Sequence, residues 1–235
     1  FKEITKVYLK PKFFFFKNIF FQSMPISISI CGYALAAAII FTYVGESGEY
    51  AVAGYGAGTR IEQVVLLPIL GINTAIISII SQNFGARNFD RIKETYFTAI
   101  KYAFIIMITS GIIVFILAGI ITSIFSGDPE VIEYGKRYLK ISAFVLPAYP
   151  VFFLSNGFFM ALKKSENAMI SNFFRNVLNP IVVFYIAKYI SASFETFFWI
   201  WVGINWFFSI SYFLIVVYYF KTRLGKSSAI VQPSP

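Results

Sequence analysis

Histidine is absent from this sequence of 235 residues, and cysteine occurs once, at Cys31. The chain therefore supports neither a disulfide framework nor a Cys/His metal site, and it lacks the commonest acid/base and nucleophile pairs of enzymes. Charged residues make up only 13% of the chain, whereas an average soluble domain has about a quarter. We therefore expect no enzymatic activity, no metal and no cofactor.

Apolar residues are abundant instead, since 58% of the chain is hydrophobic and 20% is aromatic. A membrane-spanning helix needs about 20 mostly apolar residues to cross about 30 Å of hydrocarbon. Six segments meet this requirement and predict an all-α membrane protein with spans at 18–43, 51–81, 95–125, 140–162, 167–188 and 195–220. They form one transmembrane unit, 18–220. Residues 1–17 before it fit an interfacial amphipathic helix or a plain basic linker, and residues 221–235 are predicted to be a disordered cytoplasmic tail.

The net charge of +9 is distributed over the ends of the apolar segments, not over one solvated face, which argues against a nucleic-acid partner. Most lysines and arginines fall in loops on the same side as the N-terminus. By the positive-inside rule, both termini then lie in the cytoplasm, and the protein crosses the plasma (inner) membrane several times, in contact with membrane lipid. Because the chain begins with Phe1 and no cleavable signal precedes the first span, we expect a fragment or the second half of a longer chain.

Charges within the spans are the first candidates for function, because a charge at the bilayer centre costs at least about 2.5–3.5 kcal/mol. Arg60 and Glu62 are two residues apart on the second span, so they point in different directions and cannot simply pair. Arg175 lies within the fifth span. We expect these three residues to hold the helices together and to set the polarity of a cavity, although pairing that only holds the bundle explains them equally well.

Polar side chains also recur along single faces of several spans. On the fifth span, Asn172, Arg175, Asn176 and Asn179 cover one arc of about 100°, which lipid cannot face. For any one such face, hydrogen bonding between helices is the simpler explanation. Together they predict an aqueous cavity walled by Gln22, Ser29, Tyr33, Gln63, Asn73, Tyr149, Asn156, Asn172, Asn176 and Asn179. Predicted helix breaks are Pro25, Pro68, Pro147, Pro150 and Pro180.

The stretch YGAGTRIEQVVLLPILGINTAIISIISQNFGARNFDRIKE, residues 55–94, resembles the multidrug and toxic compound extrusion (MATE) family. The resemblance rests on a Gly-x-Gly-x-x-x-Arg-Ile-Glu pattern ending at Glu62, on Leu-Pro-x-x-Gly at Pro68 and Gly71, and on Gln-Asn-x-Gly-Ala from Gln82 to Ala86.

That resemblance implies one six-helix lobe, the C-terminal one, of a twelve-helix transporter, and an N-terminal six-helix lobe as its partner. It also implies export of small organic cations or amphipathic compounds in exchange for Na⁺ or H⁺. Some relatives carry coupling carboxylates at positions that fall near Gly32 or Tyr33 and near Tyr149, where this chain has no acid. Coupling by this lobe would then depend on Glu62, or on an acid in the other lobe.

Two alternatives to an antiporter remain open on the sequence. A lipid-linked oligosaccharide flippase of the same superfamily would need cationic side chains for a pyrophosphate, and Arg60, Lys101 and Arg175 could supply them. The chain could also be a structural fragment that transports nothing by itself.

Overall fold

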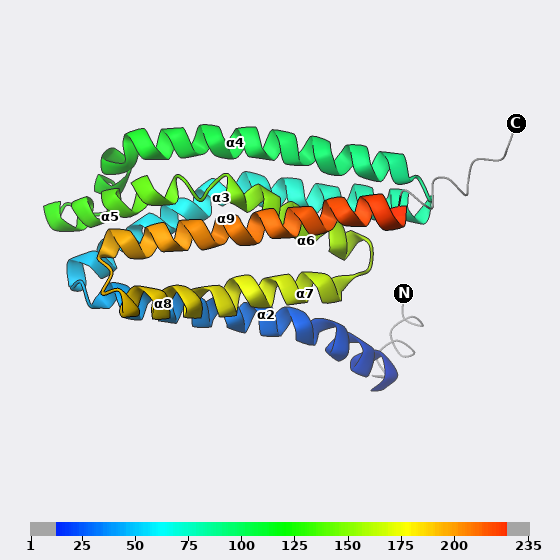
Figure 1. Ribbon diagram of the computed structural model, residues 1–235, viewed down its shortest axis with the longest axis horizontal. Coiled ribbons are helices and arrows are strands. Elements are labelled where there is room, and N and C mark those ends of the chain that lie inside the picture. Colours follow the sequence, from blue (N-terminus) through cyan, green and yellow to red (C-terminus); the bar gives the residue numbers. More distant parts are fainter. Residues whose placement is uncertain (1–12, 225–235) are drawn as a thin grey trace, which may run out of the picture.

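The computed structural model describes the backbone of residues 13–224, and the side chains in that range except those of 13–15, 17–19, 21–30, 165, 223 and 224. Every regular element in the described part is helical (Figure 1). The elements are α2 (Phe13–Gly45), α3 (Glu49–Gly85), α4 (Phe89–Ser123), α5 (Pro129–Ser142), α6 (Ala148–Ala161), α7 (Ser165–Phe173), η1 (Phe174–Leu178), α8 (Asn179–Tyr189), α9 (Phe194–Tyr219) and η2 (Phe220–Leu224). The predicted lead-in lies outside the described residues up to residue 12, and the predicted tail lies outside them from residue 225.

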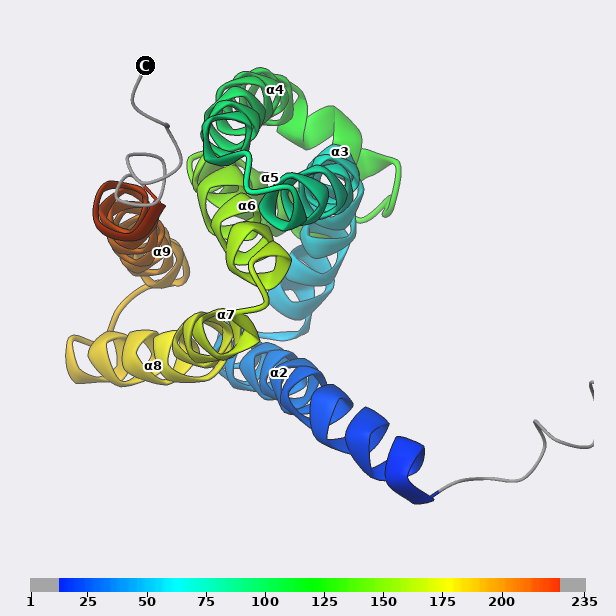
Figure 2. The ribbon, with the colours of Figure 1, turned by 90° about the vertical axis from the view of Figure 1, so that its right-hand side faces the viewer.

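The helices run back and forth along one axis, so the loops gather at the two ends of the bundle (Figure 1). Viewed end-on, α3, α4, α5 and α6 form one group, while α2, α7 and α8 form a second group (Figure 2). Helix α9 packs against α6 of the first group and α8 of the second. Within residues 13–224, three helical segments are long and apolar enough to span a membrane by themselves: Glu49–Gly85, Phe89–Ser123 and Phe194–Thr222.

Helix α3 packs against α5 through glycines. A Cβ added at Gly54 would lie 2.7 Å from the Gly135 nitrogen and the Val131 oxygen, and one added at Gly58 would lie 2.3 Å from the Tyr138 ring. Small residues let two backbones approach closely where lipid offers no hydrophobic drive for association. The glycine-rich stretch at 54–58 belongs to α3 and is helical. Glu62 therefore lies well inside α3, about 20 Å from its first residue at a rise of about 1.5 Å per residue.

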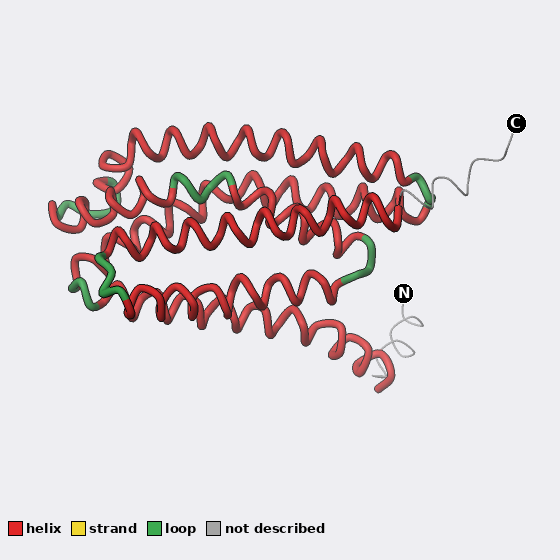
Figure 3. Tube along the Cα trace, viewed as in Figure 1, coloured by secondary structure: helices red, strands yellow, loops and turns green. Residues whose placement is uncertain are grey.

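The fourth predicted span, 140–162, differs from the structure in two ways. Its helix starts earlier, at Pro129, where the Asp128 carboxylate accepts a hydrogen bond from the Glu130 backbone N–H at 2.8 Å and caps α5. It is also interrupted at residues 143–147, between α5 and α6, where Figure 3 shows a loop within the bundle. The Trp206 indole donates a hydrogen bond of 2.9 Å to the Phe144 carbonyl in this break. The polar segment that we took for a loop is therefore the first half of a broken helix.

The predicted helix breaks have mixed outcomes. Pro147 immediately precedes α6, so it lies at a true break, and Pro150 lies in the first turn of α6. Pro68 lies inside α3 and does not end it. The backbone of α2 continues through Pro25, whose side chain lies outside the described ones. Pro180 does not end the fifth span either, because the helix continues as α8.

The π-helical turn η1 precedes Pro180 and accommodates it within a continuous helix. Proline has no N–H for the i−4 carbonyl, and its ring clashes there. The Asn179 N–H bonds the Phe174 carbonyl, five residues back, so the turn before Pro180 is widened. Arg175 and Asn176 lie on this widened turn.

Ion pairs lie at the ends of the bundle. At the end holding the 45–49 and 190–194 loops, Lys188 pairs with Glu46, and Arg137 pairs with Glu133 at 3.1 Å and with Glu195 at 3.0 Å. Hydrogen bonds from Arg137 and Lys136 hold the pKa of Glu133 below its ordinary value. These pairs connect the loop after α2 to α8, and α5 to α9.

Candidate functional site

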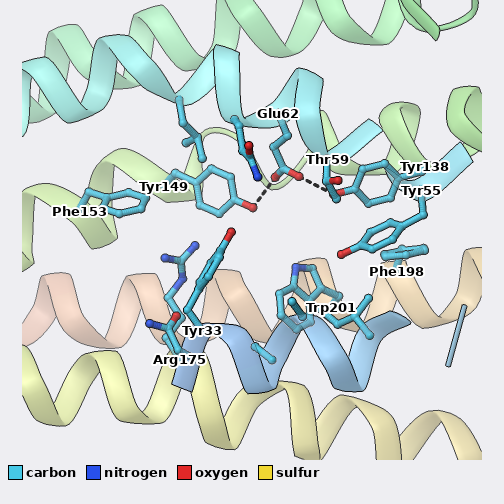
Figure 4. Close-up of a pocket in the computed structure, with 16 residues that line it drawn as sticks. Tyr33, Tyr55, Thr59, Glu62, Tyr138, Tyr149, Phe153, Arg175, Phe198 and Trp201 are labelled. Atoms are coloured by element: carbon cyan, nitrogen blue, oxygen red, sulfur yellow. Dashed lines mark hydrogen bonds between the residues drawn. The ribbon is translucent and has the colours of Figure 1, made fainter. Parts of the chain in front are cut away.

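The Glu62 carboxylate is held between two tyrosines. Its side chain is 9% exposed, and Tyr138 of α5 and Tyr149 of α6 each donate a hydrogen bond to one of its oxygens (Figure 4). A buried charge is tolerated only when its hydrogen-bonding capacity is met. The two tyrosines lie on either side of the 143–147 break, so one carboxylate of α3 is bound to both halves of the broken helix.

A cavity of about 150 Å³ lies next to this carboxylate. Helices α2, α3, α5, α6, η1 and α9 all contribute to its wall, and seven aromatic side chains line it: Tyr33, Tyr55, Tyr138, Tyr149, Phe153, Phe198 and Trp201. Its charged residues are Glu62 and Arg175. The cavity therefore combines an apolar aromatic wall with one group of each charge.

Arg175 lies against three aromatic rings. Its guanidinium carbon is 4.3 Å from the ring centre of Phe152, 4.9 Å from that of Tyr149 and 5.2 Å from that of Phe153. Its Nε donates to the Asn205 Oδ1 at 3.4 Å. Ring faces attract a cation, more strongly where water is excluded. The three rings and Asn205 therefore hold the Arg175 side chain in place.

The predicted cavity residues are distributed between this cavity and the helix interfaces. Tyr33, Gln63, Tyr149 and Asn176 line the cavity together with Glu62 and Arg175. Asn73, Asn156, Asn172 and Asn179 do not line it. The side chains of Gln22 and Ser29 lie outside the described ones.

The π-helical turn explains why the asparagines of the fifth span separate. Asn172, before the turn, accepts a hydrogen bond from the Asn156 amide at 2.9 Å, which joins α7 to α6. Asn179, after the turn, is fully buried, and neither of its amide atoms has a hydrogen-bond partner among the described residues. The extra residue of the π turn shifts the helical register, so the single arc predicted from regular α-helical spacing does not form.

Asn73 lies at the contact of α3 with α6. A Cβ at Gly157 of α6 would be 2.1 Å from the Asn73 Oδ1, so the two helices meet tightly there. Asn73, Asn156 and Asn172 therefore lie at contacts between helices.

Arg60 and Lys101 do not line the cavity. Arg60 is exposed and makes no hydrogen bond or ion pair with a described residue, so it does not hold helices of this bundle together as we expected. Lys101 is also exposed, with its ammonium nitrogen 6.0 Å from the ring centre of Tyr102. Of the three cations that a flippase would need, Arg175 alone lines the cavity.

Sequence reasoning missed several cavity residues, above all Tyr138, which we had assigned to a loop. Regular helical spacing does not relate Tyr138 to Tyr149, because the 143–147 break separates them. Tyr55, Phe198 and Trp201 carry no signal either, because aromatic residues are frequent throughout the chain. Asn205, which bonds Arg175 without lining the cavity, was also not predicted.

The MatE family model matches residues 25–186, more than half of the chain. The chain belongs to the MATE family. Among curated proteins, the multidrug resistance protein YpnP of Bacillus subtilis, itself named as probable, is 31% identical over 70% of this chain and 34% of its own length. The multidrug export protein MepA of Staphylococcus haemolyticus is 24% identical over 68% of this chain and 35% of its own length.

The MATE fold is confirmed by solved structures. A MOP superfamily transporter from Pyrococcus furiosus matches with a TM-score of 0.82 at 22% identity, over 95% of this chain and 50% of that one. A MATE protein in complex with MaL6 matches with a TM-score of 0.81 at 20% identity, over 94% and 49%. This chain thus spans about half the length of these solved MATE chains and about a third of the two curated relatives. It is a multi-pass, all-α membrane protein, and the predicted six-helix arrangement of one MATE lobe is confirmed.

Proposed function

We propose that the chain forms one lobe of a secondary active antiporter, which exports cationic or amphipathic organic compounds in exchange for Na⁺ or H⁺. The observation that carries the proposal is the aromatic-walled cavity beside the buried Glu62. Aromatic faces attract lipophilic cations, and a single carboxylate in a low-dielectric site is well suited to take up a proton or a small cation. The curated relatives YpnP and MepA, named for multidrug resistance and export, support the same function.

We also propose that a second six-helix lobe completes the substrate site. The cavity of about 150 Å³ is smaller than a pocket for a drug-sized ligand, about 300–1,000 Å³, so a whole substrate needs space beyond this lobe. Helix α3 carries exposed Arg60, Gln63, Gly71, Thr74 and Ser78 along one face. A partnerless arginine facing lipid is costly, whereas one facing a water-filled cleft between two lobes is not.

Glu62 is the proposed coupling residue of this lobe. Each of its two oxygens accepts a hydrogen bond from one tyrosine hydroxyl, Tyr138 or Tyr149. Binding of H⁺ or Na⁺ would compete with these hydrogen bonds and would loosen α5 and α6 from α3. Coupling-ion binding could thereby change the packing of the broken helix around the cavity.

We further propose that the protein lies in the plasma membrane with the ends of the described chain on the cytoplasmic side. Phe13 and Leu224 lie at the same end of the bundle as the loops that carry Arg87, Lys163 and Lys164 (Figure 1). The opposite end also carries cations, but there Lys188 is paired with Glu46, and Arg137 with Glu133 and Glu195. The three loop cations at the first end form no ion pair with a described residue, which supports the orientation given by the positive-inside rule.

Efflux of a fluorescent organic cation from energised cells tests the proposed transport. Cells that express the full-length protein are loaded with the dye, and the Tyr149→Ala variant is compared with Tyr185→Ala as a matched control on the exposed surface of α8. We expect slower efflux for Tyr149→Ala and for Asn176→Leu, and wild-type efflux for Tyr185→Ala. Unchanged efflux of every dye in both cavity variants would remove these residues from the substrate path.

A further inference from the structure

Arg175 has unused hydrogen-bonding capacity that faces the cavity. A guanidinium has five N–H donors, and the Nε donor bonds Asn205. Neither terminal nitrogen makes a hydrogen bond or ion pair with a described residue, although the side chain lines the cavity (Figure 4). In a membrane-embedded site, such donors need an acceptor for their hydrogen bonds, which must come from water or a ligand.

Glu62, the acidic residue of the cavity, differs from Arg175 because both of its terminal atoms are hydrogen-bonded. Both oxygens of Glu62 accept hydrogen bonds from tyrosines. Of the two charged residues that line the cavity, Arg175 is therefore the one whose terminal polar atoms make no hydrogen bond with a described residue. A ligand that only carried a positive charge would leave the Arg175 donors unmet.

We propose that Arg175 binds the carboxylate of an amphipathic substrate. The two terminal nitrogens of a guanidinium match the two oxygens of a carboxylate, and contacts with the rings of Tyr149, Phe152 and Phe153 hold the Arg175 guanidinium in position in advance. One guanidinium balances one carboxylate, whereas a phosphate monoester carries about −1.5 to −2 near pH 7 and would be left with excess charge beside Glu62.

The size of the cavity agrees with this assignment. About 150 Å³ accommodates a carboxylate with a few neighbouring atoms, not a whole drug-sized molecule. The rest of the substrate, including any cationic part, would lie outside this lobe. This inference rests on the proposed export of amphipathic compounds and narrows it to those that carry an acid, zwitterions included.

A matched pair of dyes tests the inference: a fluorescent xanthene dye with a free carboxylate and the methyl ester of the same dye. Binding to the purified full-length protein is measured by fluorescence anisotropy at pH 7, so the result does not depend on transport. We expect the wild type to bind the acid at least about tenfold more tightly than the ester, the lower range for a charge-assisted hydrogen bond. Arg175→Gln should lose this preference while ester binding stays the same.

Two further variants make the result specific. Arg175→Lys keeps the charge but not the planar fork, and it should retain a reduced preference for the acid. Lys101→Gln removes an exposed cation outside the cavity and should leave the preference unchanged. If Arg175→Gln does not fold, the wild-type comparison of acid with ester and the Arg175→Lys variant still decide the question.

Equal binding of both dyes by the wild type would overturn the inference, and so would an undiminished preference for the acid in Arg175→Gln. A failure of the proposed function would give a different result, because energised cells would then export neither dye. Export of both dyes with no preference for the acid would leave the antiporter standing and remove the role of Arg175.

Discussion

Two phenol hydroxyls keep Glu62 buried, and each is expected to contribute to stability by itself. Replacing Tyr138 with Phe removes one donor and leaves a carboxylate oxygen unsatisfied, which costs about 1–3 kcal/mol, or more for a charged group. We therefore expect a lower thermal midpoint for Tyr138→Phe in detergent. Tyr134→Phe is the control, since Tyr134 is on the same helix and its hydroxyl has no hydrogen bond to a described residue. Equal midpoints for both variants would contradict the role of Tyr138.

At the scale of single residues, the charged residues of the site could be identified from the sequence, but most of their contact partners could not. Glu62 and Arg175 were identified because charges are rare and costly within apolar spans. Their contacts with Tyr138, Phe152 and Asn205 depend on how helices distant in sequence pack together. Arg60 shows the limit of the same reasoning, because the sequence indicates that it needs a partner, yet no described residue forms a hydrogen bond or ion pair with it.

The close contact of α3 with α5 gives a prediction at the scale of helices. A Cβ at Gly54 would meet the backbone of α5 at 2.7 Å, whereas one at Gly56, half a turn further on, meets nothing within 4 Å. Gly54→Ala should therefore force the helices apart and lower stability by about 1–3 kcal/mol. Gly56→Ala should be neutral or stabilising by about 0.5–1 kcal/mol, because alanine favours the helix. Thermal unfolding of the two variants in detergent measures the difference, and equal midpoints would argue against close packing.

The break between α5 and α6 gives a second prediction at this scale. Trp206→Phe keeps an aromatic ring but leaves the Phe144 carbonyl without its hydrogen bond, in surroundings where lipid cannot replace it. We expect a loss of about 1–3 kcal/mol in stability, measured as a lower thermal midpoint. Trp199→Phe, which removes an exposed indole that makes no hydrogen bond with a described residue, is the control. A wild-type midpoint for Trp206→Phe would show that the break is held by other contacts.

The helices themselves could largely be predicted, because apolar length shows directly where a chain can cross a membrane. Their interruptions could be predicted only in part. Pro147 lies at a break, Pro68 lies within a continuous helix, and Pro180 follows a π-helical turn. A proline shows where a backbone hydrogen bond is missing, but the packing around it decides whether the helix ends, widens or continues.

For the whole molecule, orientation in the membrane can be checked by labelling. In a Cys31→Ser background, Lys164→Cys lies at the end of the bundle assigned to the cytoplasm and Glu130→Cys at the opposite end. A membrane-impermeant maleimide should label Glu130→Cys in intact cells. It should label Lys164→Cys only after the inner membrane is permeabilised. The opposite pattern would invert the proposed topology.

The central claim is that the buried Glu62 couples this lobe to an ion gradient. Its most direct test is dye transport by the full-length protein in proteoliposomes under an imposed Na⁺ or proton gradient, with Glu62→Gln compared with the exposed Glu94→Gln. The account predicts that the wild type and Glu94→Gln move dye against its concentration gradient, while Glu62→Gln does not. Gradient-driven accumulation by Glu62→Gln at the wild-type rate would contradict it.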